Sequence, residues 1–303
     1  MSKEYETIII GAGIAGITAA IYASRKRMNF LFFSEDFGGQ INVSGEIENY
    51  PGFSHTDYAE FGENLKKQIE YNKIKIQYEP IKKIIKLKDS SFEVRTEKKS
   101  YKTQTVILCS GARARELNVK GEKEFKGKGV TYCAICDGPL FKNKTVAVIG
   151  GGDAATEAVD YLKNIVKKVY VVTINSELKG HEYLIERVKK QKNAQIINNA
   201  RTKEVFGNKF VKGIKYEQKG KIKRLDVQGV FVEIGRIPNT EIVNSLVKRE
   251  KDGHIIVDKF CETNVPGLFS AGDCTDLHAY QYVIAAGQGC TSLLRAAYYL
   301  QRK

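Results

Sequence analysis

The chain has 303 residues, of which 42% are hydrophobic and 28% charged, and its formal net charge is +14. This describes an ordinary globular protein, long enough that one core usually splits, so we expect two domains. No apolar run reaches the roughly 20 residues of a membrane span, and the acid-containing N-terminus is unlike a signal peptide, so we expect no membrane association and a cytoplasmic location.

The first unit along the chain is a strand, a glycine turn and a helix. Thr7–Ile10 is β-branched and apolar, Gly11-Ala-Gly13-Ile-Ala15-Gly16 follows at once, and Ile17–Arg25 has helical composition. Glycines in this context let the backbone approach a pyrophosphate, and the helix N-terminus offers it free N–H groups. The pattern predicts a dinucleotide site, and a glycine turn without a ligand is the alternative.

A second strand, Phe30–Phe33, leads to Glu35 and Asp36. An acid about 20 residues after the glycines is where a ribose hydroxyl is held, so Glu35 is the expected ribose ligand, with Asp36 in reserve. Further on come the loops Gly38-Gly39-Gln40 and Glu48-Asn49-Tyr50-Pro51-Gly52, and a helical stretch near Tyr58–Tyr71. Residues 74–108 indicate short alternating strands, ending in small residues at Ser110-Gly111 that suit contact with a cofactor.

Residues 130–139 hold the most distinctive chemistry. Cys133 and Cys136 stand two residues apart and Asp137 follows, which is the spacing of a reversible dithiol beside a proton donor. Half a zinc site and two unrelated buried cysteines are the alternatives. A second pair of ligands at finger spacing does not follow, so the sequence predicts no metal site.

The pattern of the N-terminus then begins again. Thr145–Ile149 is a strand, Gly150-Gly-Gly152-Asp-Ala-Ala155 is a second glycine turn, and Thr156–Asn164 is helical. Val169–Thr173 is the second strand of this unit. Two such dinucleotide-binding units in one chain indicate a flavin enzyme and not a simple dehydrogenase.

The last third contains a strand that ends in an acid. Leu268–Asp273 closes in Gly272-Asp273, and a helical stretch covers Gln281–Leu300. A carboxylate and helix N–H groups at such a place can face a cofactor's ribityl and phosphate groups. We expect this segment to return to the first domain, which makes the middle of the chain an insertion.

The remaining cysteines and the positive charge carry less information. Cys109, Cys261, Cys274 and Cys290 stand singly, as small buried hydrophobes do. The basic surface suggests nucleic acid, but no recognition motif accompanies it, so we expect no nucleic-acid partner. An acidic protein partner or plain solubility explains the charge equally well.

With these residues in hand, nearly the whole chain is similar to the low-molecular-weight thioredoxin reductases, a family of FAD flavoproteins. The matches, in the family's order, are Gly11-x-Gly13-x-x-Gly16, Gly38-Gly39-Gln40, Glu48-Asn49-Tyr-Pro-Gly52, Cys133-x-x-Cys136-Asp137, Gly150-x-Gly152-x-x-Ala155, Gly235-x-x-Pro-Asn-Thr240, and Gly272-Asp273 with Gln281. The resemblance implies an α/β fold of two Rossmann-like three-layer domains in a homodimer. The FAD domain would be discontinuous, 1–114 and 241–303, with the redox domain, 115–240, inserted in it.

The resemblance also implies roles for the site residues. Cys136 would lie against the flavin and receive its electrons, Cys133 would attack the disulfide of thioredoxin, and Asp137 would supply protons. FAD contacts would come from the residues Gly11, Gly13, Ala15, Gly16, Glu35, Gly39, Gln40, Asn49, Gly111, Gly272, Asp273 and Gln281.

One segment departs from the family. Members that use NADPH carry His-Arg-Arg-x-x-x-Arg after the second strand of the inserted domain, because a 2′-phosphate needs cationic partners. Here the residues are Thr173-Ile-Asn-Ser-Glu-Leu-Lys179, in which both arginines are missing. No Asp or Glu stands at the end of the preceding strand, where the NADH ribose would be held. Tyr280 replaces an Arg before Gln281. The chain therefore resembles the branch whose electron donor is ferredoxin, an acidic protein that a net charge of +14 would attract.

Three alternatives stay open at this point. The same reductase could use NADPH or NADH through a rearranged pocket that includes Lys179. It could deliver electrons to a different thioredoxin-fold protein or small disulfide. It could also be a flavin-binding redox sensor without turnover.

Overall fold

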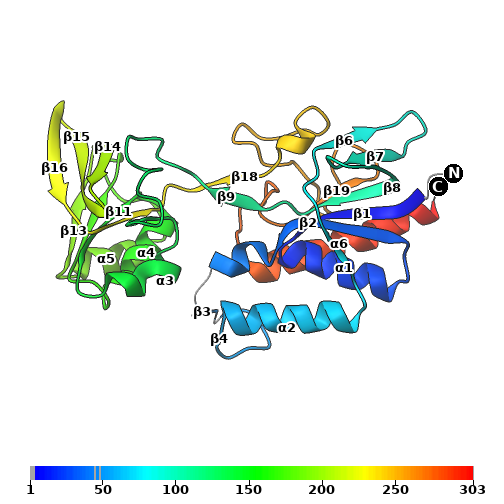
Figure 1. The fold of residues 1–303 in the computed structure, drawn as a ribbon, viewed down its shortest axis with the longest axis horizontal. Coiled ribbons are helices and arrows are strands. Elements are labelled where there is room, and N and C mark those ends of the chain that lie inside the picture. Colours follow the sequence, from blue (N-terminus) through cyan, green and yellow to red (C-terminus); the bar gives the residue numbers. More distant parts are fainter. Residues whose placement is uncertain (1–3, 44–45, 48, 303) are drawn as a thin grey trace. The chain divides into compact units, whose positions relative to one another are not determined.

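The chain divides into two compact units, of which the computed structural model describes residues 4–43, 46–47 and 49–302. Unit 1 comprises residues 1–113 and 237–303, and unit 2 comprises residues 114–236. The two connecting segments, β9 (Ala112–Ala114) and β18 (Arg236–Pro238), pair with each other (Figure 1). The expected boundaries, 114/115 and 240/241, lie near these divisions. The assignment of the units as FAD domain and redox domain stays a prediction.

Unit 1 is built on a seven-stranded sheet in the order β5-β2-β1-β8-β7-β6, with β19 also paired to β8. Its strands are β1 (Glu4–Ala12), β2 (Phe30–Phe37), β5 (Ile76–Tyr78), β6 (Lys83–Lys86), β7 (Phe92–Arg95), β8 (Ser100–Leu108) and β19 (Leu268–Ser270). The pairs β5-β2, β2-β1, β1-β8 and β8-β19 are parallel, whereas β6 and β7 are antiparallel additions. The parallel strands therefore end at one edge, where α/β proteins bind ligands.

Alternation along β1 explains why both faces of this sheet are buried. Ile9 packs in the cluster that contains the helical residues Ile17 and Leu293, whereas Ile8 and Ile10 pack on the other face with Val94. Successive side chains of a strand point to opposite faces, so an unbroken apolar run fits a strand covered on both sides.

Three helices cover one face of the unit 1 sheet: α1 (Ile14–Arg25), α2 (Tyr58–Tyr71) and α6 (Tyr282–Gln301) (Figure 1). Helices α1 and α6 approach so closely that a Cβ on Gly289 of α6 would lie 2.0 Å from the Ala15 carbonyl oxygen. The short elements of this unit are η1 (Gly39–Val43), β3 (Glu46–Ile47), β4 (Thr56–Asp57) and η3 (Glu241–Val243). Among the described residues, no helix combines the length and apolarity needed to cross a membrane.

Unit 2 has three layers. A parallel sheet, β10-β17-β11-β12-β13, has helices on one face and an antiparallel sheet, β14-β15-β16, on the other. Its strands are β10 (Val130–Thr131), β11 (Thr145–Ile149), β12 (Lys168–Val172), β13 (Ala194–Ile197), β14 (Ala200–Gly207), β15 (Val211–Gln218), β16 (Lys221–Asp226) and β17 (Gly229–Val232). Its helical elements are α3 (Ala134–Asp137), η2 (Gly138–Phe141), α4 (Asp153–Leu162) and α5 (Glu182–Lys190).

The expected α/β class with two Rossmann-like domains, one of them discontinuous, is confirmed. The main differences lie at helix starts: α1 begins at Ile14 and α4 at Asp153, each three residues before the expected start. The last three residues of each glycine motif are already helical, so they form the first turn of the helix. The elements between residues 174 and 229 (α5 and β13 to β16) were not predicted.

Candidate functional site

A cavity of about 590 Å³ opens in unit 1 at the carboxyl ends of β1, β2, β8 and β19. This size is typical of cofactor pockets. Nine of the predicted FAD contacts line it, namely Gly11, Gly13, Ala15, Glu35, Gly39, Gln40, Gly111, Gly272 and Asp273. Gly16, Asn49 and Gln281 are not among its lining residues.

The glycine turn after β1 has a physical reason for each glycine. Gly11 has φ +101°, and a Cβ there would lie 2.2 Å from the Cys109 carbonyl oxygen at the end of β8. Gly13 is the N-cap of α1, has no neighbour within 4 Å of a built Cβ, and leaves the helix N-terminus without a side-chain cap. A Cβ on Gly16 would lie 1.8 Å from the Gly11 carbonyl oxygen. Gly13 therefore leaves room for a phosphate, whereas Gly11 and Gly16 allow close packing.

The end of β2 supplies the ribose side of the cavity. The buried Ser34 hydroxyl oxygen accepts a hydrogen bond from the backbone N–H of Ala12, at 2.9 Å, and so ties β2 to the glycine turn. Glu35 follows with an exposed side chain and lines the cavity. A carboxylate at this position is available to a ribose hydroxyl.

The opposite side of the cavity is held by α6. The Tyr282 hydroxyl donates to the Gln40 carbonyl oxygen at 3.1 Å, and the Gln40 side chain donates to the Ala112 carbonyl oxygen at 2.9 Å. Asn49 and Gln281 contact each other, with 3.1 Å between Nδ2 and Oε1, outside the cavity lining. Glu48, part of the predicted loop motif, lies outside the described residues.

Several lining residues were missed from the sequence. Arg113 donates to Asn239 Oδ1 at 2.6 Å and to Glu241 Oε1 at 2.7 Å, and all three line the cavity. Only the Gly235–Thr240 motif offered a signal for this group, through Asn239. Tyr282 carried no signal, because a helical tyrosine is usually a packing residue.

The residues present fit FAD. The turn has an open glycine cradle, the α1 N-terminus has no acid in its first turn, and Glu35 and Asp273 line the same cavity. Free N–H groups at a helix N-terminus favour an anionic phosphate. The pyrophosphate would be held at Gly13, and the ribose and ribityl hydroxyls at Glu35 and Asp273.

The dithiol motif lies in unit 2 at the start of the one-turn helix α3. Cys133 is disulfide-bonded, and Cys136 lies within α3, with its side chain outside the described part of the structure. The Thr131 hydroxyl donates to Asp137 Oδ2, and the Cys133 N–H donates to the Thr131 hydroxyl oxygen at 3.2 Å. Thr131 therefore holds the backbone of Cys133 and the Asp137 carboxylate in one network.

Glu233, just after β17, is a further acid at the dithiol that the sequence did not single out. Its carboxylate accepts a hydrogen bond from the Ala134 N–H, next to Cys133. Burial raises the Glu233 pKa to about 7, against the opposing effect of Arg236, and Glu157 raises it further. The protein thus keeps a group that exchanges protons near neutral pH beside the redox motif.

The second glycine turn is contacted by the segment that follows β12. The Lys179 N–H donates to the Gly151 carbonyl oxygen at 2.6 Å, and the His181 N–H donates to Asp153 Oδ1 at 2.7 Å. The side chain of Thr173 is buried at the end of β12. Helix α4 also has an acid, Asp153, in its first turn, whereas α1 has none. A carboxylate at this position disfavours binding of an anionic phosphate.

The other four cysteines were expected to be small buried residues, and three of them are buried. Cys109, Cys261 and Cys274 are buried, whereas Cys290 is half-buried. Burial raises the pKa of the Cys109 and Cys274 thiols, and raises that of Cys261 to about 12. These three thiols stay protonated at neutral pH and are poor nucleophiles.

Comparison with known proteins finds relatives whose sequences match nearly the whole chain. The NADH dehydrogenase of Bacillus subtilis (strain 168) is 43% identical over 303 residues, which cover 99% of this chain and 59% of that protein. An alkyl hydroperoxide reductase component of Escherichia coli (strain K12) is 40% identical over 305 residues, covering 98% of this chain and 58% of that protein. The chain thus spans about three-fifths of the length of these curated relatives.

Among solved structures, the thioredoxin reductase of Lactococcus lactis has a TM-score of 0.88 at 31% identity, and the match covers 99% of this chain and 100% of that one. The predicted resemblance to low-molecular-weight thioredoxin reductases is confirmed, and so is the prediction of FAD as the cofactor. A family model described as pyridine nucleotide-disulphide oxidoreductase matches residues 5–289. The chain belongs to the pyridine nucleotide-disulphide oxidoreductase family.

Proposed function

We propose that this protein is a flavin-dependent disulfide reductase that passes electrons from reduced ferredoxin, through FAD and the Cys133/Cys136 dithiol, to thioredoxin. The observation that carries the reductase activity is the Cys-x-x-Cys-Asp motif with Cys133 in a disulfide, on the fold of a thioredoxin reductase. When bound, FAD supplies a carrier that accepts electrons singly or in pairs.

The thiol chemistry balances within the chain. Two electrons and two protons convert the Cys133–Cys136 disulfide to a dithiol. The Cys133 thiolate then attacks the acceptor disulfide and forms a mixed disulfide, and Cys136 displaces it, which re-forms the protein's disulfide and releases the acceptor as a dithiol. Asp137, held by Thr131, would give and take the protons.

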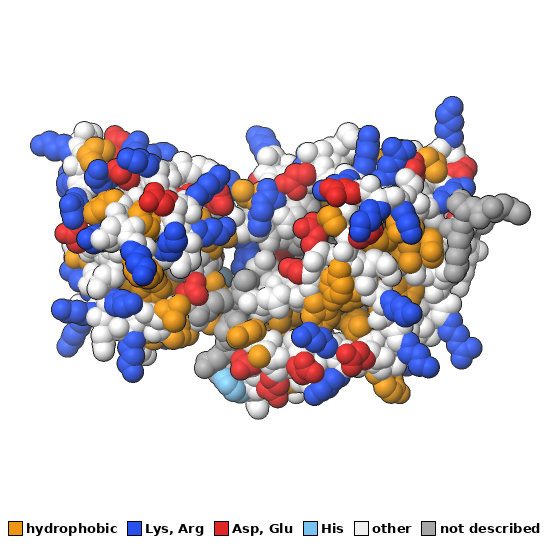
Figure 2. Space-filling view, in the orientation of Figure 1, with side chains coloured by type: hydrophobic (Ala, Val, Ile, Leu, Met, Phe, Trp, Pro, Cys, Tyr) orange, Lys and Arg blue, Asp and Glu red, His pale blue; other side chains and the backbone are white. Residues whose placement is uncertain are grey.

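Two observations support ferredoxin as the donor. The second glycine turn is contacted by Lys179 and begins a helix with Asp153, and the Thr173 to Lys179 segment lacks both arginines. Lys and Arg side chains are also spread over the face seen in Figure 2, among acidic and hydrophobic ones, in keeping with a net charge of +14. An acidic one-electron carrier suits such a surface.

NADH is the second candidate donor, and the names of the relatives favour it. The protein from Bacillus subtilis that is 43% identical over this chain is called an NADH dehydrogenase. For NADH to serve here, Lys179 or a neighbouring residue would have to hold the adenosine ribose without a carboxylate at the end of β12.

The donor is tested by anaerobic mixing of the flavin-loaded protein with photoreduced ferredoxin, with NADH and with NADPH. Bleaching of the oxidised flavin band within minutes by ferredoxin alone supports the proposal. Prompt bleaching by a nucleotide overturns the ferredoxin assignment and leaves the reductase assignment intact.

The reductase activity is tested separately with Cys136→Ser. Reduction of thioredoxin should fall by at least about a thousandfold, because without the resolving thiol the mixed disulfide is not released. Cys290→Ser, which removes a half-buried thiol outside the motif, is the matched control and should keep full activity. Full turnover by Cys136→Ser would contradict the proposal. Comparison of several thioredoxin-fold acceptors identifies the substrate, and sedimentation of the purified protein tests the expected homodimer.

A further inference from the structure

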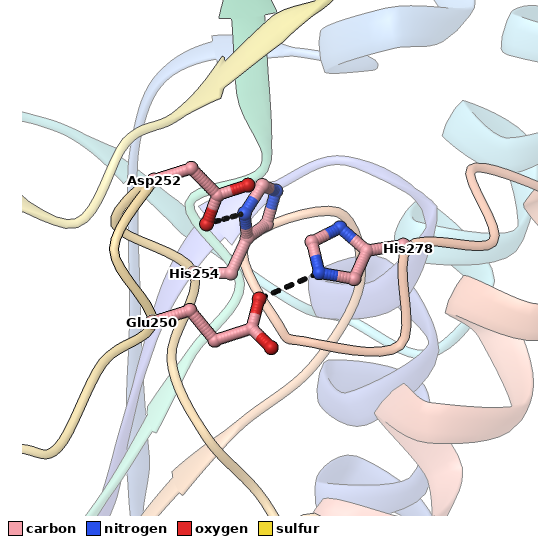
Figure 3. A group of neighbouring side chains, drawn as sticks. All are labelled: Glu250, Asp252, His254 and His278. Atoms are coloured by element: carbon pink, nitrogen blue, oxygen red, sulfur yellow. Dashed lines mark hydrogen bonds and ion pairs between the residues drawn. The ribbon is translucent and has the colours of Figure 1, made fainter.

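Two histidines and two carboxylates meet in unit 1, in a cluster that has no role in the proposed thiol chemistry. Glu250, Asp252, His254 and His278 each offer one ligand atom, and these four atoms all lie within 4.8 Å of one another (Figure 3). Spacing along the sequence predicted no metal site, because these residues form neither a second Cys-x-x-Cys pair nor a closely spaced pair of histidines. The two histidines stand on separate segments, and only the fold brings them together.

Two backbone segments build the cluster. Residues 250–254 form a turn, in which the Glu250 N–H donates to the His254 carbonyl oxygen at 2.9 Å. The Ile255 N–H then donates to the Cys274 carbonyl oxygen at 2.9 Å, and the Asp276 N–H donates back to the Ile255 carbonyl oxygen at 3.0 Å. This short ladder fixes the segment that carries His278 against the turn that carries the other three residues.

His254 is the residue whose environment points to a ligand. Its side chain is 2% exposed, and its Nδ1 lies 2.9 Å from Asp252 Oδ1. Asp252 pairs with this nitrogen and the pairing lowers the Asp252 pKa, although the geometry of the contact is poor for a hydrogen bond. A buried ring nitrogen normally has a well-directed partner. A metal ion bound by both Nδ1 and the Asp252 carboxylate would replace this poorly directed pair with two metal–ligand bonds.

The other ring nitrogen of His254 has a partner that suits metal binding. His254 Nε2 lies 2.9 Å from the Tyr280 hydroxyl. A proton on Nε2, donated to the Tyr280 oxygen, leaves Nδ1 with a lone pair directed at the cluster. Metal-bound histidines are oriented in this way, by a hydrogen bond from the nitrogen that does not bind the metal.

The distances bracket those of a tetrahedral site. His278 Nε2 lies 2.6 Å from Glu250 Oε2, and the ligand atoms of the cluster are all within 4.8 Å of one another. Ligand atoms around Zn²⁺ at bond lengths of about 2.0 to 2.2 Å lie roughly 3.3 to 3.6 Å apart. Small rotations of the three exposed side chains would bring the set to that geometry.

We propose that Glu250, Asp252, His254 and His278 form a binding site for a divalent transition metal ion, with Zn²⁺ the best match. Two imidazole nitrogens select transition metals over Mg²⁺ and Ca²⁺, which prefer oxygen ligands. Two carboxylates neutralise the charge of the ion. The competing interpretation is a pair of independent histidine–carboxylate ion pairs that bind no metal.

Position in the fold suggests what the ion does. Gly272, Asp273 and Ala285 line both the large cavity and a small pocket formed by residues that include His278 and Tyr280. An ion at the cluster would fasten the segment 277–280 beside the predicted FAD site. It would act as a structural clamp on this side of the cavity.

The test is equilibrium dialysis of the full-length, flavin-loaded protein against Zn²⁺, with bound metal measured by mass spectrometry. The protein is kept oxidised so that the dithiol cannot bind the ion. We expect one Zn²⁺ per chain and a raised thermal midpoint. His278→Ala and Glu250→Gln should each weaken binding at least about tenfold.

His181→Ala is the matched control, because it removes an exposed histidine of unit 2 and should leave Zn²⁺ binding unchanged. His278 and Glu250 are both exposed, so their variants should fold, and the midpoint without metal checks this. Less than one ion per chain in the wild-type protein, or equal binding by His278→Ala, would overturn the proposal. X-ray absorption at the zinc edge should show two imidazoles, and a spectrum with oxygen ligands alone would also overturn it.

Discussion

At the scale of single residues, the acid beside the dithiol makes a pH-dependent contribution to stability. The pKa of Glu233 is about 7 in the fold, above the ordinary value of 4.5, because burial disfavours the carboxylate. A group with a raised pKa in the fold contributes stability below its unfolded pKa, and loses that contribution as the pH rises through its folded pKa.

Glu233→Gln should therefore flatten this part of the stability profile. Between pH 5 and pH 8 the wild-type protein should lose roughly 1 to 3 kcal/mol of unfolding free energy that the variant keeps. Urea unfolding at several pH values measures the difference. Glu177→Gln, which changes an exposed acid of the same unit, should track the wild type, and parallel curves for Glu233→Gln would refute the assignment.

Residue identity also separates the six cysteines into two kinds. The motif cysteines and Asp137 were found from spacing alone, because a dithiol is a local pattern. Glu233 has no such pattern and follows an apolar strand like many surface acids. Only the fold shows that its carboxylate reaches the Ala134 N–H and is half-buried.

At the scale of elements, the turn between β1 and α1 combines three constraints in a few residues. It must adopt positive φ at Gly11, pass close to the end of β8, and leave the α1 N-terminus open. A side chain at Gly11 violates the first two constraints at once.

Gly11→Ala should lower the thermal midpoint and abolish retention of the flavin, because a Cβ would lie 2.2 Å from the Cys109 carbonyl oxygen at φ +101°. Gly62→Ala in α2 is the matched control, since its Cβ would meet nothing within 4 Å. That change should raise stability by about 0.5 to 1 kcal/mol. Flavin absorbance after gel filtration measures flavin retention, and thermal unfolding measures the midpoint, for both variants. A Gly11→Ala protein that keeps its flavin would contradict the explanation.

The two glycine turns share one sequence motif but differ in the residues around them. Both open a helix after a parallel strand, but α1 has no acid in its first turn and α4 begins with Asp153. A Cβ on Gly150 would lie 2.0 Å from the Glu233 carbonyl oxygen. Packing alone thus requires this glycine, so it is no evidence for a nucleotide.

At the scale of the whole molecule, the charge of +14 makes a prediction about the donor. Attraction between a basic protein and an acidic carrier is long-ranged and screened by salt, with a Debye length of about 10 Å at 0.1 M. The rate constant kcat/KM for ferredoxin should fall on the order of tenfold between low and moderate salt.

The control for this prediction is reduction of a small neutral disulfide with dithionite as the electron source, which should change little over the same salt range. A ferredoxin rate that does not depend on salt would mean that the charge serves solubility. The two rates are measured with one protein preparation, so changes in flavin content cancel.

Local patterns in the sequence were enough to predict several features of this protein. Strand, turn and helix at Gly11–Gly16 and at Gly150–Ala155 and the dithiol at Cys133 and Cys136 follow from periodicity and spacing, whereas the α/β class was implied by the resemblance to thioredoxin reductases. Other features depend on contacts between distant segments and are visible only in the folded protein. They are the cavity lining by Arg113 and Tyr282, the environment of Glu233, and the proximity of His254 to His278. These could not be predicted, because burial and the distance between residues far apart in the chain are set by packing.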